Sequence, residues 1–211
     1  METAGEHTKE PATDRAQQLL DAAEALLIED GYDGLSAQAV ARRAGVNKAL
    51  VFYYWGSTAE LFERMLERYY ARHERALTEA LAVEGTLAER VHHLIDAYLD
   101  YMEANRGYLR IVQQQVSGLG PHLPVVQRHL GDMMQISAGL LAGLAPANGA
   151  TAARHLHLSL SAMVVNYFTY APAMGAAWGP DDPMSTTSLA ERRAHVHWVV
   201  DAWLNHLAAP G

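Results

Sequence analysis

Apolar residues recur at helical spacing along almost the whole chain, whereas strict alternation of apolar and polar residues lasts only a few positions. In residues 16–27 they recur mainly at intervals of three and four. Such spacing places them on one face of a helix, which is buried against other helices. Half of the 211 residues are apolar, enough for a substantial core. The sequence therefore predicts an all-α protein of about nine helices.

Capping residues indicate where several helices begin. The tetrapeptides that start at Ser57, Thr86 and Ser188 each place a glutamate three positions after a hydroxyl residue, the pattern of a capping box. A loop rich in Gly, Pro and Asp is expected at 173–187. Between the last two boxes the pattern predicts three helices, at about 107–117, 124–144 and 149–172.

The strongest local signal lies in residues 36–55, SAQAVARRAGVNKALVFYYW. Ala41 and Gly45 stand four residues apart, as a tight helix-turn-helix requires. The small side chain lets two helices approach, and the glycine can take the positive φ of the turn. Asn47 can cap the second helix just after that turn. In helix-turn-helix proteins this second helix enters the major groove of DNA.

The charge of this segment also favours DNA. With 16 basic and 24 acidic residues the chain has a formal net charge of −8, which argues against promiscuous nucleic-acid binding. Residues 34–59 contain no acid, however, while Arg42, Arg43 and Lys48 give a local charge of +3. Phosphates respond to this local charge, because charges are screened beyond about 8 Å at physiological salt. Polar groups suited to phosphate oxygens are also present: Asn47, Tyr53 and Tyr54.

Each of these residues also has an ordinary structural explanation when taken singly. Tyr53, Tyr54 and Trp55 could be core aromatics, and Arg42 with Arg43 could form a solvated helix face. The ordered set of turn glycine, cap, lysine, aromatics and missing acids favours DNA binding.

Residues 13–68 resemble the N-terminal domain of the tetracycline-repressor (TetR) family of bacterial transcription regulators. Its pattern, G-[YF]-x-x-x-[ST] and then A-x-x-A-G-V-[ST]-x-x-x-[LV]-Y-x-[HY]-F, stands here as GYDGLS at 31–36 and ARRAGVNKALVFYYW at 41–55. A capped helix then follows at Ser57. Among the departures from the pattern, Phe52 replaces a tyrosine, Trp55 replaces a phenylalanine, and Thr58 replaces the usual lysine.

The resemblance implies a homodimeric regulator, most often a repressor, which a small-molecule effector releases from a near-palindromic operator. It implies a three-helix DNA-binding domain at 13–58, after a flexible tail at 1–12. A helical bundle for ligand binding and dimerisation follows at 59–211. By matching position, Gln38, Lys48, Ala49 and Leu50 would face bases. The full expected DNA-binding set is Ser36, Gln38, Arg42, Arg43, Asn47, Lys48, Ala49, Leu50, Tyr53, Tyr54 and Thr58.

Aromatic, methionine and polar residues in the C-terminal part are candidates for an effector pocket, since such pockets are mainly apolar with a few oriented polar groups. Any one of them could instead be an ordinary core residue. The set carries no formal charge, so we expect a neutral effector that is lipophilic or aromatic. Its members are Tyr98, Tyr101, Met102, His129, Met133, Met134, Met163, Asn166, Tyr167 and Tyr170.

The last two long helices, at about 149–172 and 188–208, are the expected homodimer interface. Both carry broad apolar faces, and a pair from each subunit could form a four-helix bundle. Trp203 and Leu204 are expected near this interface.

Other functions find little support. The chain has no cysteine, and its paired histidines stand adjacent or two apart, so we expect neither a metal site nor a cofactor. No nucleophile or phosphate-binding motif predicts an enzyme. The alternative is a helical ligand-binding protein or enzyme without DNA function. No secretory signal is visible, and His and Pro residues interrupt the uncharged run at 155–180, so we expect a soluble cytoplasmic protein with no membrane partner.

Overall fold

The computed structural model describes residues 12–118 and 120–208. The chain forms two compact units, the first ending at Arg68 and the second beginning at Tyr69. This division falls inside a helix, later than the boundary expected at 58–59. The tail expected at 1–12 lies outside the described residues, apart from Ala12.

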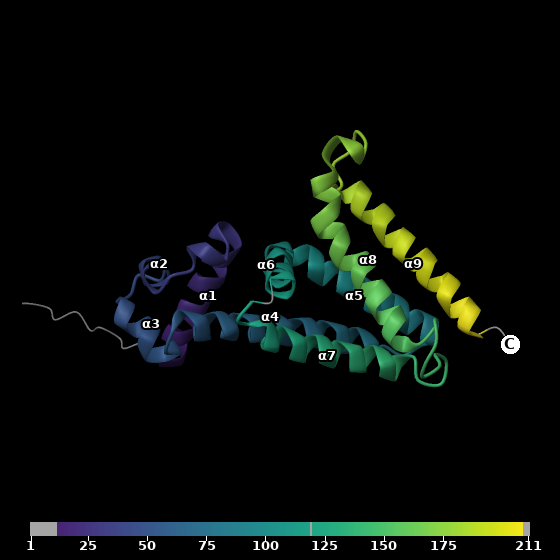
Figure 1. The fold of residues 1–211 in the computed structure, drawn as a ribbon, viewed down its shortest axis with the longest axis horizontal. Helices are drawn as coiled ribbons and strands as arrows, with labels where there is room; N and C mark the ends of the chain where they lie inside the picture. The colour runs from purple at the N-terminus through teal and green to yellow at the C-terminus, as the bar shows by residue number, and fades with distance from the viewer. Residues whose placement is uncertain (1–11, 119, 209–211) are drawn as a thin grey trace, which may run out of the picture. The chain divides into compact units, whose positions relative to one another are not determined.

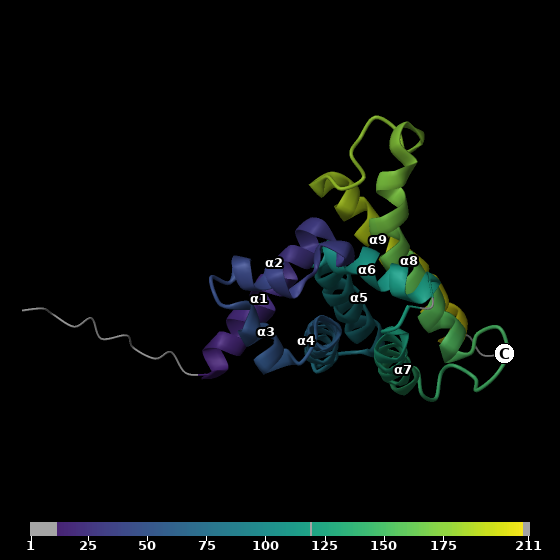
Figure 2. The same ribbon diagram turned by 60° about the vertical axis from the view of Figure 1, so that its left-hand side comes forward.

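The described residues form nine α-helices and two short 3₁₀ turns, without a strand (Figure 1 and Figure 2). The all-α prediction is therefore confirmed. The helices are α1 (Ala12–Asp30), α2 (Ala37–Arg43), α3 (Lys48–Trp55), α4 (Thr58–Leu81), α5 (Leu87–Ala104), α6 (Arg106–Ser117), α7 (Leu123–Leu140), α8 (Ala153–Met174) and α9 (Thr186–Ala208). In that part of the chain, no helix is long and apolar enough to cross a bilayer.

The first unit consists of α1, α2, α3 and the first part of α4. One side chain from each helix is almost fully buried in its core, namely Leu19, Val40, Val51 and Phe62. Arg68 ties α4 to α1, because its Nε donates to Glu24 at 2.7 Å and its Nη1 lies 2.7 Å from Asp21. These contacts explain why the first part of α4 belongs with the three preceding helices.

The second unit consists of the end of α4 with α5 to α9. Its main core includes Ile95 of α5, Val164 of α8 and Val196 of α9, all fully buried. Figure 1 shows α8 and α9 running side by side in opposite directions. Trp203 and Leu204 pack partly buried against this unit's own core.

Most predicted caps are present, but one is wrong. Thr86 and Glu89 form the expected capping box, and Ser57 Oγ accepts from the Glu60 amide at 3.1 Å. Ser188, by contrast, lies inside α9. Ser185 caps that helix instead, because its Oγ accepts the Ser188 amide at 3.2 Å. The Ser188 hydroxyl is thereby left to donate to the Asp182 carbonyl at 2.9 Å.

Two other boundaries also differ from expectation. The helix expected at 124–144 ends at Leu140, and the next begins at Ala153 rather than near 149. That helix, α8, continues through Pro172 to Met174, so it extends into the loop expected at 173–187. The bundle core holds this last turn, since Ala171 is buried beside the proline.

Candidate functional site

The turn between α2 and α3 has the geometry that a helix-turn-helix requires. Gly45 has φ +65°, and a Cβ at this position would meet nothing within 4 Å, so the backbone conformation alone favours glycine. Ala41 is buried, and its carbonyl accepts the Val46 amide at 3.0 Å. Gln18 of α1 donates to the Ala44 carbonyl at 3.2 Å, which fixes the turn on the first helix. The expected positive φ at Gly45 is confirmed.

Side-chain caps set the start of both helices. Ser36 Oγ accepts the Ala39 amide at 3.1 Å at the start of α2. Asn47 Oδ1 accepts the Ala49 amide at 2.9 Å, so α3 begins at Lys48. Because these caps satisfy amides that would otherwise lack partners, the two short helices have defined first turns.

One face of α3 is exposed over its whole length. Lys48, Ala49, Phe52 and Tyr53 share this face at helical spacing, whereas Val51 on the opposite side is fully buried. Tyr53 is the most exposed of the large hydrophobic side chains described in the first unit, at 77%. The structure therefore leaves the first turn of α3 accessible to a groove.

The positive charge on this surface is smaller than the sequence suggests. Both guanidinium nitrogens of Arg43 donate to Glu29 of α1, at 2.5 and 2.7 Å. These hydrogen bonds lower the pKa of Glu29 and raise that of Arg43. Arg42 and Lys48 are exposed and have no acidic partner among the described residues. Glu29 lies outside residues 34–59, so counting charges within that segment missed it.

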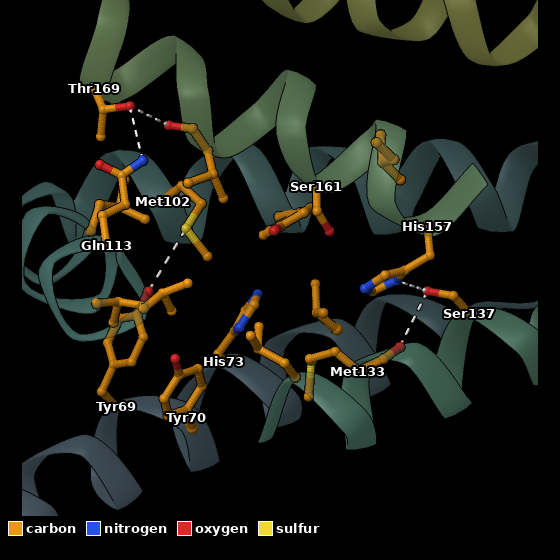
Figure 3. Close-up of a pocket in the computed structure, with 18 of the residues that line it drawn as sticks. Tyr69, Tyr70, His73, Met102, Gln113, Met133, Ser137, His157, Ser161 and Thr169 are labelled. Carbon is orange, nitrogen blue, oxygen red and sulfur yellow. Dashed lines mark hydrogen bonds between the residues drawn. The ribbon is translucent and has the colours of Figure 1, made fainter. Parts of the chain in front are cut away.

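A cavity of about 600 Å³ lies in the second unit, lined by the end of α4 and by α5 to α8 (Figure 3). This volume is within the usual range for small-molecule sites. No Asp, Glu, Lys or Arg lines it. Burial lowers the pKa of His73 to about 4 and also lowers that of His157, so both imidazoles are neutral at pH 7. The wall is therefore uncharged.

The expected pocket residues divide into two groups. Four of them line the cavity: Tyr98, Met102, Met133 and Tyr170. The other six do not: Tyr101, His129, Met134, Met163, Asn166 and Tyr167. Several of these hold the bundle together instead. Tyr101 donates to the Tyr69 carbonyl at 2.5 Å, and Tyr167 donates to the Pro183 carbonyl at 2.6 Å.

Several wall residues were not predicted. Tyr70 and His73 of α4 and His157 of α8 line the cavity alongside Gln113 and Ser137. The predicted pocket set included no residue of α4. The spacing of Tyr70 and His73 on one helix face was the signal that could have extended it.

Comparison with known proteins bears on the helix-turn-helix in particular. Residues 19–65 match the family model described as bacterial regulatory proteins, tetR family. This part of the chain is therefore similar to the DNA-binding region of the TetR family. The match covers the end of the first helix, the whole helix-turn-helix and the start of α4.

Two solved structures extend the similarity to the whole fold. A transcriptional regulator of Pseudomonas aeruginosa PAO1 has a TM-score of 0.73 at 18% identity, covering 95% of this chain and 93% of that one. A TetR-like regulator of Rhodococcus sp. RHA1 has a TM-score of 0.64 at 21% identity, covering 92% and 99%. At these identities the likeness is one of fold.

Curated relatives match over a shorter region. The HTH-type transcriptional activator FasR of Mycolicibacterium smegmatis is 26% identical over 102 residues, which are 48% of this chain and 47% of FasR. The nucleoid occlusion factor SlmA of Pasteurella multocida is 28% identical over 105 residues, which are 49% of this chain and 53% of SlmA. The matches thus span about half the length of these relatives.

The departures at Phe52, Trp55 and Thr58 have distinct surroundings. Phe52 is exposed, and the Lys48 ammonium lies 5.7 Å from the centre of its ring. Trp55 is half-buried, and its indole N–H has no partner within the described part of the chain. Thr58 is the first residue of α4, where its hydroxyl is close to the helix N-terminus.

Proposed function

We propose that the chain is a TetR-type transcription regulator whose α3 binds in the major groove of DNA. The observation that carries this proposal is the exposed face of α3, which begins at a capped first turn directly after the glycine turn. In helix-turn-helix proteins the N-terminal residues of this helix contact base edges. The DNA-binding domain would end near residue 58, and the rest of the chain would serve ligand binding and dimerisation. Since its target is the operator, the protein would act in the cytoplasm.

The exposed polar and basic residues of α2 and α3 have complementary roles in this proposal. Gln38 and Lys48 would read bases through hydrogen bonds, beside Ala49 and Leu50. The phosphate backbone of the DNA would be contacted by Ser36, Arg42, Asn47, Tyr53, Tyr54 and Thr58. Arg43 would contribute less than an unpaired arginine, because Glu29 already neutralises it.

A homodimer through α8 and α9 would present two copies of α3 to the two halves of a near-palindromic operator. Large apolar side chains on these helices support this interface. Leu158 is 64% exposed and Trp198 is 67% exposed, although both lie on helices that otherwise pack into the core. Trp198→Ser should therefore shift the protein towards monomer in light scattering, and Trp178→Ser in the preceding loop serves as the control.

We further propose that the regulator is a repressor and that a neutral, lipophilic or aromatic effector releases it from DNA. The uncharged wall of the 600 Å³ cavity supports such an effector. A catalytic role is not proposed. Ser137 Oγ lies 2.7 Å from His157 Nδ1, but it also lies 3.2 Å from the Met133 carbonyl. When the hydroxyl donates its hydrogen bond to that carbonyl, the histidine does not receive it, and the serine is left without activation.

Selection of duplexes from a random-sequence library at about 150 mM salt tests the DNA proposal, because non-specific binding weakens there through counterion release. We expect one near-palindromic sequence to be enriched. On that sequence, Lys48→Ala should weaken the binding free energy by about 1–3 kcal/mol and relax specificity at one base pair. Arg64→Ala is the matched control, since Arg64 is already paired with Glu67 at 2.8 Å. Equal losses with both variants, or no enrichment, would contradict the proposal.

A further inference from the structure

Two polar side chains in the cavity wall lack hydrogen-bond partners among the described residues. They are Tyr70, through its hydroxyl, and His73, through both ring nitrogens. Tyr70 is 3% exposed and His73 is 5% exposed, so neither is in contact with bulk solvent. Figure 3 shows both side chains reaching from α4 towards the cavity. Buried polar groups in native proteins normally have partners, so these two indicate a place for one.

The remaining polar side chains of the wall contrast with this pair. Tyr170 is exposed to solvent, and the others are hydrogen-bonded within the protein. The pairs are Tyr69 with Met102 Sδ, Tyr98 with Ser161, Gln113 with Thr169, Ser117 with the Gln113 carbonyl, and Ser137 with His157. Unused hydrogen-bonding capacity is therefore concentrated at one turn of α4.

Aromatic neighbours fix the two groups in place. The His73 ring stacks with those of Tyr98 and Tyr101, whose centroids are 5.1 and 4.8 Å away. Tyr70 stacks on His129 at 4.6 Å. Because Tyr70 and His73 stand three residues apart on a helix, they also face the same side. Such rigid groups bind a ligand at a smaller entropy cost than mobile ones.

The pair is suited to an uncharged group. Burial keeps His73 neutral at pH 7, with one N–H donor and one acceptor nitrogen, and it raises the pKa of the Tyr70 hydroxyl. A carboxylate or ammonium group would lose its hydration in this cavity without meeting an opposite charge, which is unfavourable. A ligand hydroxyl or carbonyl can pair with both residues at lower cost.

We propose that Tyr70 and His73 form a polar subsite for the uncharged hydroxyl or carbonyl oxygen of a ligand whose apolar body fills the rest of the cavity. The role of this ligand as effector rests on the proposed function above. The binding itself does not depend on DNA.

Displacement of the neutral fluorescent dye N-phenyl-1-naphthylamine at pH 7.5 tests the subsite, with 1-decanol, 2-decanone and decanoate as competitors of equal chain length. We expect 1-decanol or 2-decanone to bind at least about tenfold more tightly than decanoate. Tyr70→Phe and His73→Phe should each weaken that binding about tenfold, the effect of one lost buried hydrogen bond. Tyr69→Phe is the matched control, because the Tyr69 hydroxyl already has Met102 as its partner.

Thermal unfolding without ligand separates this role from a structural one. Tyr70→Phe removes a hydroxyl that has no partner, so it should unfold at no lower temperature than the wild type. The proposal fails if the dye or both neutral competitors do not bind, if decanoate binds as tightly, or if Tyr69→Phe and Tyr70→Phe have equal effects. The displacement assay contains no DNA and the duplex selection contains no ligand, so the two proposals can fail independently.

Discussion

Protonation of His73 should make the second unit sensitive to acid. Burial lowers the pKa of this imidazole from 6.5 to about 4, whereas the unfolded chain keeps the ordinary value. Between pH 7.5 and 5.5 the unfolded state therefore takes up nearly one proton here and the folded state almost none. The free energy of unfolding should fall by about 1.4 kcal/mol over that interval because of this group alone. Below about pH 4 the folded state also binds the proton, and the loss levels off.

Urea denaturation at the two pH values measures this effect when the wild type is compared with His73→Phe. Phenylalanine keeps the stacking against Tyr98 and Tyr101 but cannot be protonated. His157 is present in both proteins, so its own lowered pKa cancels in the difference. His206→Phe, at an exposed position on α9, should keep the wild-type pH dependence. If His73→Phe loses stability with acid as steeply as the wild type, the imidazole is not held neutral by burial.

Three further changes test the first unit and its surface. Asn47→Ala removes the cap of α3, so urea denaturation should show a free energy of unfolding lower by about 1 kcal/mol. Asn47→Ser keeps a capping oxygen and should retain most of the wild-type stability. Gly45→Ala should lower the free energy of unfolding by about 1–2 kcal/mol, because alanine is strained at the positive φ of this position. Gly131→Ala should instead raise it by about 0.5–1 kcal/mol, because Gly131 lies inside α7 where an added Cβ would meet nothing within 4 Å. Glu29→Gln should release Arg43, so that DNA affinity rises at low salt and the logarithmic salt slope steepens by about 0.9, the effect of one added phosphate contact.

The features that could be predicted from the sequence are those decided within one or two helical turns. Gly45 and Asn47 determine their own turn and cap with partners only a few residues away, so pattern alone located them. The same local logic was wrong at Ser188, because Ser185 stands one turn earlier and competes for the same role. A capping box identifies the start of a helix only where no other capping residue precedes it closely.

Residues brought together by packing could not be located in this way. The cavity wall takes side chains from five helices, and their rotation about their axes decides which residues face inward. Tyr101 and Met102 are neighbours in sequence, yet only Met102 lines the cavity, while Tyr101 packs behind His73. The predicted pocket residues carry no formal charge, and neither does the cavity wall, but composition could not identify Tyr70 and His73 as polar groups without a hydrogen-bond partner among the described residues.

The Arg43–Glu29 pair shows the same limit in the electrostatics of the DNA-binding surface. The two residues are 14 positions apart, and only the packing of α2 on α1 brings their side chains within hydrogen-bonding distance. Under the proposed function, phosphates approaching α3 would meet Arg42 and Lys48 as cations without an acidic partner among the described residues, whereas Arg43 is already paired. Since each phosphate contact contributes to the salt dependence of binding, the Arg43–Glu29 pair would limit non-specific affinity in the proposed complex and leave more of the discrimination to the exposed face of α3.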